Sequence, residues 1–215
     1  MAELEKHFPP TTPQAIASYN FTDIGEGTGI VKVYGSESSD TSATTYSLSQ
    51  NPLYSSSILL TSTSKTIGKT IDEDFDIQFN TPKIIDGKLK VNVAFGLANS
   101  SGTGDTRFHI IVKARKWDGS TETELGSSTS DSPLVNPSNS TYALKNFEID
   151  IPRTQFKSGD IFRITLEFHL ETVISGTMTY GFGIDPKNRE GSGSGFSSGD
   201  VTEFTVYIPF ILIDL

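Results

Sequence analysis

The sequence contains no cysteine, which excludes a fold held by disulfide bonds and a metal site built on thiolates. It also lacks any apolar run near the roughly 20 residues that a helix needs to cross a bilayer, so we expect no membrane partner. Its 215 residues fit one large β-domain, and a chain of this length buries a substantial core without covalent staples.

Basic residues are scarce relative to acidic ones: 17 Lys and Arg stand against 26 Asp and Glu, for a net charge of −9. Such a chain repels phosphates, which predicts that nucleic acid is not a partner. The one basic stretch, KARKW at residues 113–117, is interpreted as the solvated end of a strand.

Helical periodicity is nearly absent, and what recurs instead is the alternation of apolar and polar residues that is typical of β-strands. The clearest example places five apolar side chains on one face: Phe162, Ile164, Leu166, Phe168 and Leu170. Similar alternation at residues 71–79, at residues 89–97 and elsewhere predicts roughly eight to ten strands. We therefore predict an all-β fold, an antiparallel, jelly-roll-like β-sandwich.

The chain is expected to divide into an extended N-terminal arm, residues 1–20, and a single β-sandwich domain, residues 21–215. Prolines in the first segment disfavour regular structure there. Two polar segments, residues 118–141 and 185–200, are too long for tight hairpin turns. We expect each to be either a mobile tip or a segment ordered by a partner.

Two acidic patterns invite comparison with metal sites. Glu167, His169 and Glu171 alternate onto one strand face, and Asp72, Asp74 and Asp76 do so on another. We interpret both as solvated polar faces, because no second histidine is close in sequence to the first set and a straight strand presents few carbonyls for calcium. We predict no metal site, while binding of a metal by either triplet remains the alternative.

Signatures of catalysis are missing. No G-x-S-x-G occurs, and the glycines at positions 25, 27 and 29 lead into a strand, which is typical of a turn rather than of a phosphate-binding loop. We predict no catalytic residue and no cofactor, and we expect that the chain is not an enzyme.

Three stretches carry a resemblance to a known group of proteins: SYNFTDIGEGTGIVKVYG at residues 18–35, NFEIDIPRTQFKSGDIFRITLEFHLE at residues 146–171 and GFGIDPKNRE at residues 181–190. They resemble virion structural proteins of tailed double-stranded DNA viruses. Within that group the chain is most similar to capsid decoration, or cement, proteins with jelly-roll-like folds.

The resemblance implies a virion structural protein that sits on the capsid exterior after assembly in the host cytoplasm. Its partners would be copies of itself, as a homo-oligomer and specifically a trimer, and the major capsid protein or other virion proteins. The alternative is a tail, baseplate or fibre-associated module that binds a carbohydrate or receptor. In that case residues 118–141 and 185–200 would carry the binding surface.

The C-terminal run TVYIPFILIDL is apolar on both faces, although a half-buried strand needs only one. Pro209 has no N–H to donate, which indicates an edge strand or a bulge. Either the N-terminal arm or a neighbouring subunit is expected to cover the surplus apolar face. The interface is therefore predicted to comprise Phe8, Pro9, Pro10, Pro13, Tyr207, Pro209, Ile211, Ile213 and Leu215.

Overall fold

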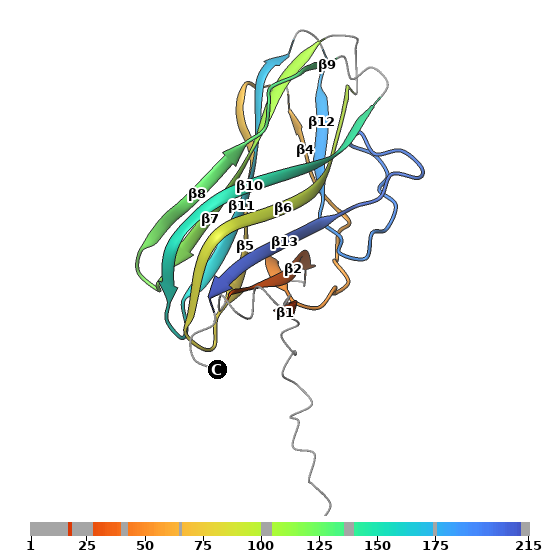
Figure 1. The fold of residues 1–215 in the computed structure, drawn as a ribbon. Helices are drawn as coiled ribbons and strands as arrows, with labels where there is room; N and C mark the ends of the chain where they lie inside the picture. The colour runs from red at the N-terminus through yellow and green to blue at the C-terminus, as the bar shows by residue number, and fades with distance from the viewer. Residues whose placement is uncertain are drawn as a thin grey trace, which may run out of the picture.

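The computed structural model describes residues 17–18, 28–39, 43–64, 66–99, 105–135, 140–173 and 176–211. Every regular element in these ranges is a β-strand, so the prediction of an all-β fold is confirmed (Figure 1). The strands are β1 (Ala17–Ser18), β2 (Thr28–Ser39), β3 (Thr44–Ser49), β4 (Leu59–Ser64), β5 (Gly68–Gln78), β6 (Lys83–Asn99), β7 (Thr106–Trp117), β8 (Glu122–Thr129), β9 (Leu134–Val135), β10 (Thr141–Phe156), β11 (Ile161–Val173), β12 (Met178–Gly183) and β13 (Phe204–Ile211). None of the described residues belongs to a helix that would be long and apolar enough to cross a membrane.

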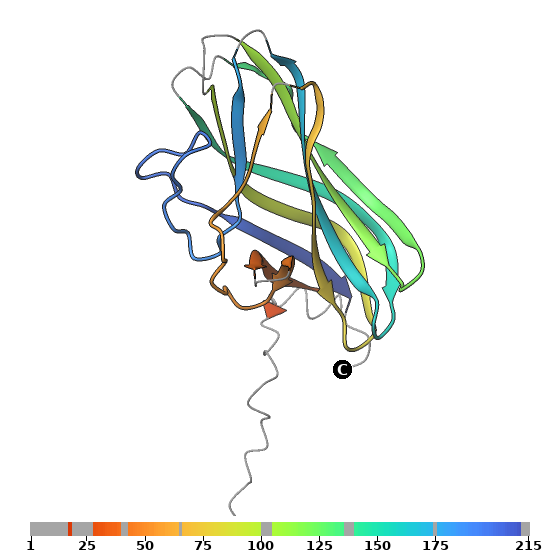
Figure 2. The same cartoon turned by 180° about the vertical axis from the view of Figure 1, so that it is seen from behind.

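The strands form two facing layers of a β-sandwich (Figures 1 and 2). In one layer β6 pairs with β10 on one edge and with β12 and β13 on the other, and β13 continues to β2. The other layer runs β5, β11, β7 and β8. Pairing is antiparallel apart from one parallel contact, in which Ser47 of β3 meets Asp76 of β5 and joins the layers.

Alternating apolar residues fill the space between the layers as predicted. The β11 side chains Phe162, Ile164, Leu166 and Phe168 are fully buried. Phe168 stacks on Tyr180 of the opposite layer, with 4.3 Å between ring centroids. Burial of one such side chain is worth about 1.5–3 kcal/mol, so this seam fixes how the layers face each other.

The strand β6 is buried on both faces along residues 93–97, because the segment before β13 covers its outer side. Phe196 packs against Gly96, where a Cβ would come within 2.6 Å of the ring. Backbone hydrogen bonds between Gly193 and Phe196 close a turn beside it. The polar segment at residues 185–200 is therefore packed onto the sandwich by its own chain, so the expectation of a mobile tip or a partner-ordered segment was wrong there.

The pattern missed three strands: β1, β3 and β9. The sequence of β3, TTYSLS, has only two large apolar residues, and only Leu48 of them is buried. This segment forms a strand because it pairs with the edge of β2. Pairing of this kind depends on the neighbouring strand, so the sequence of the segment itself does not indicate it. The polar segment at residues 118–141 also contains a longer strand, β8, which runs from Glu122 to Thr129.

Candidate functional site

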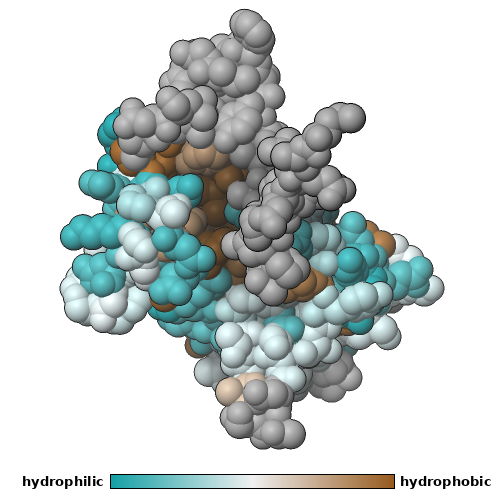
Figure 3. Space-filling model, turned by 90° about the horizontal axis from the view of Figure 1, so that it is seen from below, coloured by the Kyte–Doolittle hydropathy of each residue, from teal (hydrophilic) through white to brown (hydrophobic). Residues whose placement is uncertain are grey.

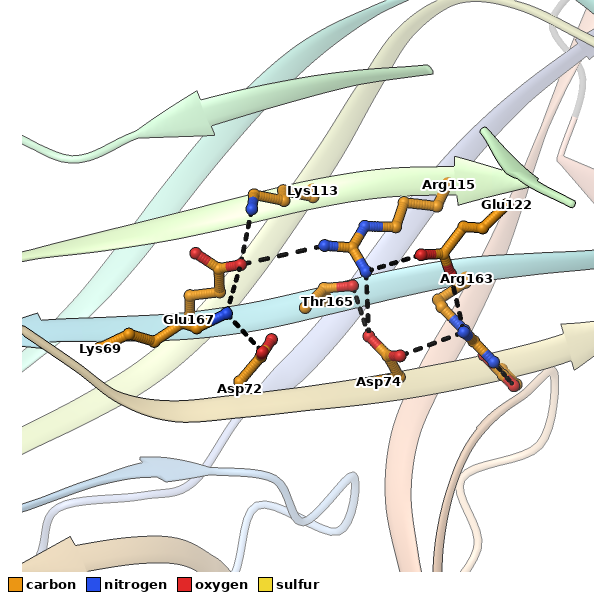
Figure 4. A network of polar contacts seen from close by, with 10 residues as sticks. Lys69, Asp72, Asp74, Lys113, Arg115, Glu122, Arg163, Thr165 and Glu167 are labelled. Atoms are coloured by element: carbon orange, nitrogen blue, oxygen red, sulfur yellow. Dashed lines mark hydrogen bonds and ion pairs between the residues drawn. The ribbon is translucent and has the colours of Figure 1, made fainter. Parts of the chain in front are cut away.

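The densest group of polar side chains lies on the outer face of β5, β11 and β7 (Figure 4). We call it the charged ladder. It consists of Lys69, Asp72, Asp74, Asp76, Lys113, Arg115, Glu122, Arg163, Thr165 and Glu167. Odd-numbered residues of β11 point outward because their even-numbered neighbours fill the core, and the register with β5 and β7 brings opposite charges together.

Arg163 ties three strands of the ladder together. Its Nε and Nη2 donate to the two carboxylate oxygens of Asp76 at 2.7 and 2.8 Å. Its Nη1 donates to Glu122 of β8 at 2.7 Å and lies 3.1 Å from Asp74. The hydrogen bonds to Asp76 outweigh partial burial and raise the pKa of Arg163. This planar, bidentate geometry is the strong form of an ion pair, and it braces β5, β11 and β8.

Glu167 is the most buried charged member of the ladder, with only 2% of its side chain exposed. Burial opposes ionisation, but Lys113 donates to Oε1 at 2.6 Å and His169 bonds to Oε2 at 2.8 Å. With Lys69 also 3.6 Å away, these contacts lower the pKa of Glu167 to about 2. The carboxylate is therefore ionised at neutral pH in spite of its burial.

Two histidines stack beside the ladder. The rings of His109 and His169 lie 4.7 Å apart and nearly parallel. Nδ1 of His109 bonds to Glu171, whose other oxygen accepts a hydrogen bond from Ser132 at 2.7 Å. A nucleophilic triad needs the hydroxyl bonded to the imidazole and the imidazole to the carboxylate. Here the serine bonds to the carboxylate instead, so this arrangement does not activate Ser132.

The two triplets that invited comparison with metal sites do not converge. Glu167 and His169 bond to each other, whereas Glu171 turns to His109. The aspartates at positions 72, 74 and 76 are spread along β5 and each contacts a cation of the ladder. Within the described ranges no group of three or more His, Asp or Glu side chains is placed to hold a metal ion.

The basic stretch at residues 113–117 is engaged in internal ion pairs. Lys113 pairs with Glu167, and Arg115 lies 3.1 Å from Glu122. Lys116 points elsewhere and contacts Asp160 at 2.9 Å. The stretch does end the strand β7, but the interpretation of its cations as solvated was wrong, because Glu167 of β11, Glu122 of β8 and Asp160 pair with them.

Of the residues predicted to form an interface, Tyr207, Pro209 and Ile211 lie within β13. The others fall outside the described ranges: Phe8, Pro9, Pro10, Pro13, Ile213 and Leu215. Of the predicted N-terminal arm only Ala17–Ser18 is described, and it pairs with Ile30 and Val31 of β2.

The strand β13 lies between β2 and β6, so the edge alternative for Pro209 was wrong and the bulge alternative is confirmed. Its ladder with β6 is interrupted between Tyr207 and Phe210, opposite Gly87 with a φ of 110°. A proline fits there because the missing N–H falls where the ladder is already broken. Tyr207 faces outward, and Lys32 lies 5.5 Å from its ring centroid.

Sequence reasoning missed a second polar cluster, formed by Asp185, Arg189 and Tyr54. Asp185 is fully buried and bonds to Nε of Arg189 at 2.6 Å, while Tyr54 is 74% exposed. The only local signal was an acidic and a basic residue four positions apart in a segment read as a polar loop. The contact to Tyr54 spans the chain and leaves no trace in the sequence.

Comparison with known proteins gives no match to any family model and none to a curated protein. A solved α-amino acid ester hydrolase shares the fold with a TM-score of 0.51 and 10% identity, over 83% of this chain and 36% of that one. A CocE/NonD family hydrolase from Staphylococcus aureus has a TM-score of 0.46 and 9% identity over the same shares. The structure of infectious bursal disease virus, Gx strain, has a TM-score of 0.23 and 11% identity, over 96% of this chain and 62% of that one.

The chain thus spans about a third of the length of these hydrolases, and the likeness to the ester hydrolase concerns the β-sandwich fold. The comparison nevertheless contradicts the expectation that the chain is not an enzyme, because the same sandwich occurs within a hydrolase. That expectation rested on missing local motifs. A segment equivalent to a third of an enzyme need not contain them, so their absence was no ground for the exclusion.

Proposed function

We propose that this chain is a structural subunit of a virion that binds copies of itself and the major capsid protein by adding strands at a sheet edge. The observation that carries the proposal is the pairing of Ala17–Ser18 with the outer edge of β2. On that edge no described strand pairs with residues 28–29 or 32–33. An unpaired edge of this kind is a ready template for a strand from another chain.

Apolar surface beside this edge supports the same proposal. Figure 3 views the molecule from below and shows apolar side chains in a hollow, with hydrophilic side chains to its left. The strands β5 and β13 end at this end of the sandwich (Figure 1), and Ile77, Phe79 and Ile211 there are only partly buried. Burial of such side chains stabilises an interface by about 25 cal/mol per Å² before the cost of association.

The choice of a virion comes from the resemblance of residues 18–35, 146–171 and 181–190 to virion proteins. The predicted interface includes Pro13, which precedes β1 by only four residues. This part of the predicted interface is therefore close in sequence to the strand that pairs with the edge of β2. The charged ladder suits a load-bearing role, since its cations and carboxylates satisfy one another and stiffen one face of the sandwich.

Light scattering on the full chain and on a variant without residues 1–16 tests strand addition. We expect the full chain to form a homo-oligomer, specifically a trimer, and the shortened chain to be a monomer with an unchanged circular dichroism spectrum. Leu134→Ser serves as control, because this exposed residue lies on β9, far in the sheet from β2. A monomeric full chain, or an oligomer that survives the deletion, would refute the proposal.

A second candidate follows from the fold that the chain shares with the α-amino acid ester hydrolase: it would be the β-sandwich portion of a hydrolase of amino acid esters. Hydrolysis of a chromogenic amino acid ester by the protein in its natural full-length form tests this candidate. Turnover that is lost when residues 17–211 are removed would support it, and a rate equal to the buffer rate would overturn it.

A further inference from the structure

Two segments far apart in the sequence meet on one side of the sandwich. The segment between β3 and β4, orange in Figures 1 and 2, lies beside the segment between β12 and β13, drawn in blue. Ile184 donates its backbone N–H to the carbonyl of Ile58 at 3.0 Å. Arg189 donates from Nη2 to the carbonyl of Ser55 at 2.8 Å. These bonds hold the two segments in a fixed relation.

A buried carboxylate positions the arginine at this junction. Asp185 is fully buried, and its Oδ2 accepts from both Nε and the backbone N–H of Arg189. Its Oδ1 has no hydrogen-bond partner among the described residues. Burial of a carboxylate is costly, and replacement of a buried ion pair by apolar residues often stabilises a protein. Stability alone therefore does not account for this pair. Its structural effect is to hold the Arg189 guanidinium in one position at the surface.

The guanidinium stands over an exposed aromatic ring. The Arg189 Cζ lies 5.2 Å from the ring centroid of Tyr54, and Nζ of Lys187 lies 5.6 Å from the same centroid. Tyr54 is 74% exposed and its neighbour Leu53 is 51% exposed. In the described part of the chain Nη1 of Arg189 makes no hydrogen bond and Lys187 makes no ion pair. Two cations and an exposed aromatic ring thus meet at one spot, and an exposed leucine precedes that ring in the sequence.

We propose that this spot, which we call the Tyr54 site, binds a saccharide residue that carries a single carboxylate. Nη1 of Arg189 and Nζ of Lys187 would each donate to the carboxylate, because hydrogen bonds between a cation and a carboxylate are the strong ones. Tyr54 and Leu53 would contact the apolar face of the sugar ring. The net charge of −9 repels polyanions such as nucleic acid or acidic peptides, which favours a ligand with one localised charge. The Tyr54 site does not depend on the proposed virion function.

Titration calorimetry on the full chain tests the proposal with named saccharides. Sialyllactose and a glucuronate-terminated disaccharide are the carboxylated probes, and lactose and cellobiose are their neutral counterparts. We expect one carboxylated probe or both to bind at least tenfold more tightly than the neutral counterpart, with affinity falling as salt rises. No binding by either carboxylated probe up to about 10 mM would overturn the proposal, as would equal binding of the neutral sugars or tighter binding of a glutamate-rich peptide.

Variants identify the residues. Lys187→Gln and Tyr54→Ala should each weaken binding at least about fivefold, because each removes one contact from an exposed position that no core packing depends on. Arg189 is less suitable, since its loss leaves Asp185 unpaired in the interior. Lys83→Gln, at an exposed lysine on β6, is the matched control and should bind as the unmodified chain does. Unchanged affinity in both test variants would overturn the assignment of the site.

Discussion

Replacement of Glu167 by Gln removes the buried charge of the ladder while keeping the shape of the side chain. The pKa of this carboxyl lies near 2 against an ordinary value of 4.5. Since a difference of one pKa unit corresponds to about 1.4 kcal/mol, the folded state stabilises the ionised form by about 3 kcal/mol. We therefore expect Glu167→Gln to lower the free energy of unfolding at pH 7 by about 3 kcal/mol, a loss typical of a broken buried pair.

The pH dependence of that loss follows from the direction of the pKa change. A carboxyl whose pKa is lowered by folding contributes stability above its unfolded pKa and loses it as the pH falls toward the folded value. The difference between the two proteins should thus be full above about pH 5 and shrink steadily between pH 4.5 and pH 2. Urea unfolding followed by the fluorescence of Trp117, the only tryptophan, measures it.

Two further variants make the test specific to Glu167. Glu148 also pairs with two lysines, but its side chain is 52% exposed, so Glu148→Gln should change stability little. Lys113→Met combined with Glu167→Gln should recover at least half of the loss, because neither charge then remains buried without its partner. The reasoning is refuted if the loss is the same from pH 7 to pH 2.5, or no larger than that of Glu148→Gln.

Three smaller changes extend the account to other parts of the fold. Tyr180→Phe should raise the thermal midpoint by roughly 2–4 °C, because the buried hydroxyl that it removes has no hydrogen-bond partner among the described residues; a lower midpoint would contradict this. Gly96→Ala should cost about 1–3 kcal/mol and speed proteolysis near Phe196, since the added Cβ would meet that ring at 2.6 Å. Arg163→Lys should lower the free energy of unfolding in urea by about 1 kcal/mol, because the bidentate pair with Asp76 is lost. Unchanged stability would contradict the role of Arg163 in linking the strands.

The core was predictable because it depends on a local pattern. Every second residue of a strand points the same way, so Phe162, Ile164 and Leu166 could be assigned to the interior from their spacing alone. The same rule failed for β3, whose one buried side chain, Leu48, gives no alternation to detect. The alternation at residues 71–79 puts Glu73 on the same face as Ile71 and Phe75, and it gives no reason for a charge there. In the structure Glu73 is half-buried with a raised pKa, first through burial and then through neighbouring carboxylates.

The polar sites were not predictable because they depend on register between distant strands. Alternation correctly places Glu167 on the outer face, yet its lowered pKa depends on Lys113, 54 residues away. Arg163 meets Asp76 across 87 residues, and Arg189 meets Ser55 across 134. No spacing within one strand reports such pairs. The expectation of a chain without enzymatic activity failed for a related reason, since it rested on local motifs, and the contradicting evidence is a likeness of fold.

Quantitative mass spectrometry on purified particles of the proposed virus tests the central proposal most directly. If the chain is a structural subunit on the capsid exterior, peptides from residues 28–39 and 105–135 should be present in a number comparable to that of the major capsid protein. A count of a few to a few dozen copies would move the chain to the tail or a fibre and contradict its assignment to the capsid. Absence of the chain from the particles would contradict a virion role altogether.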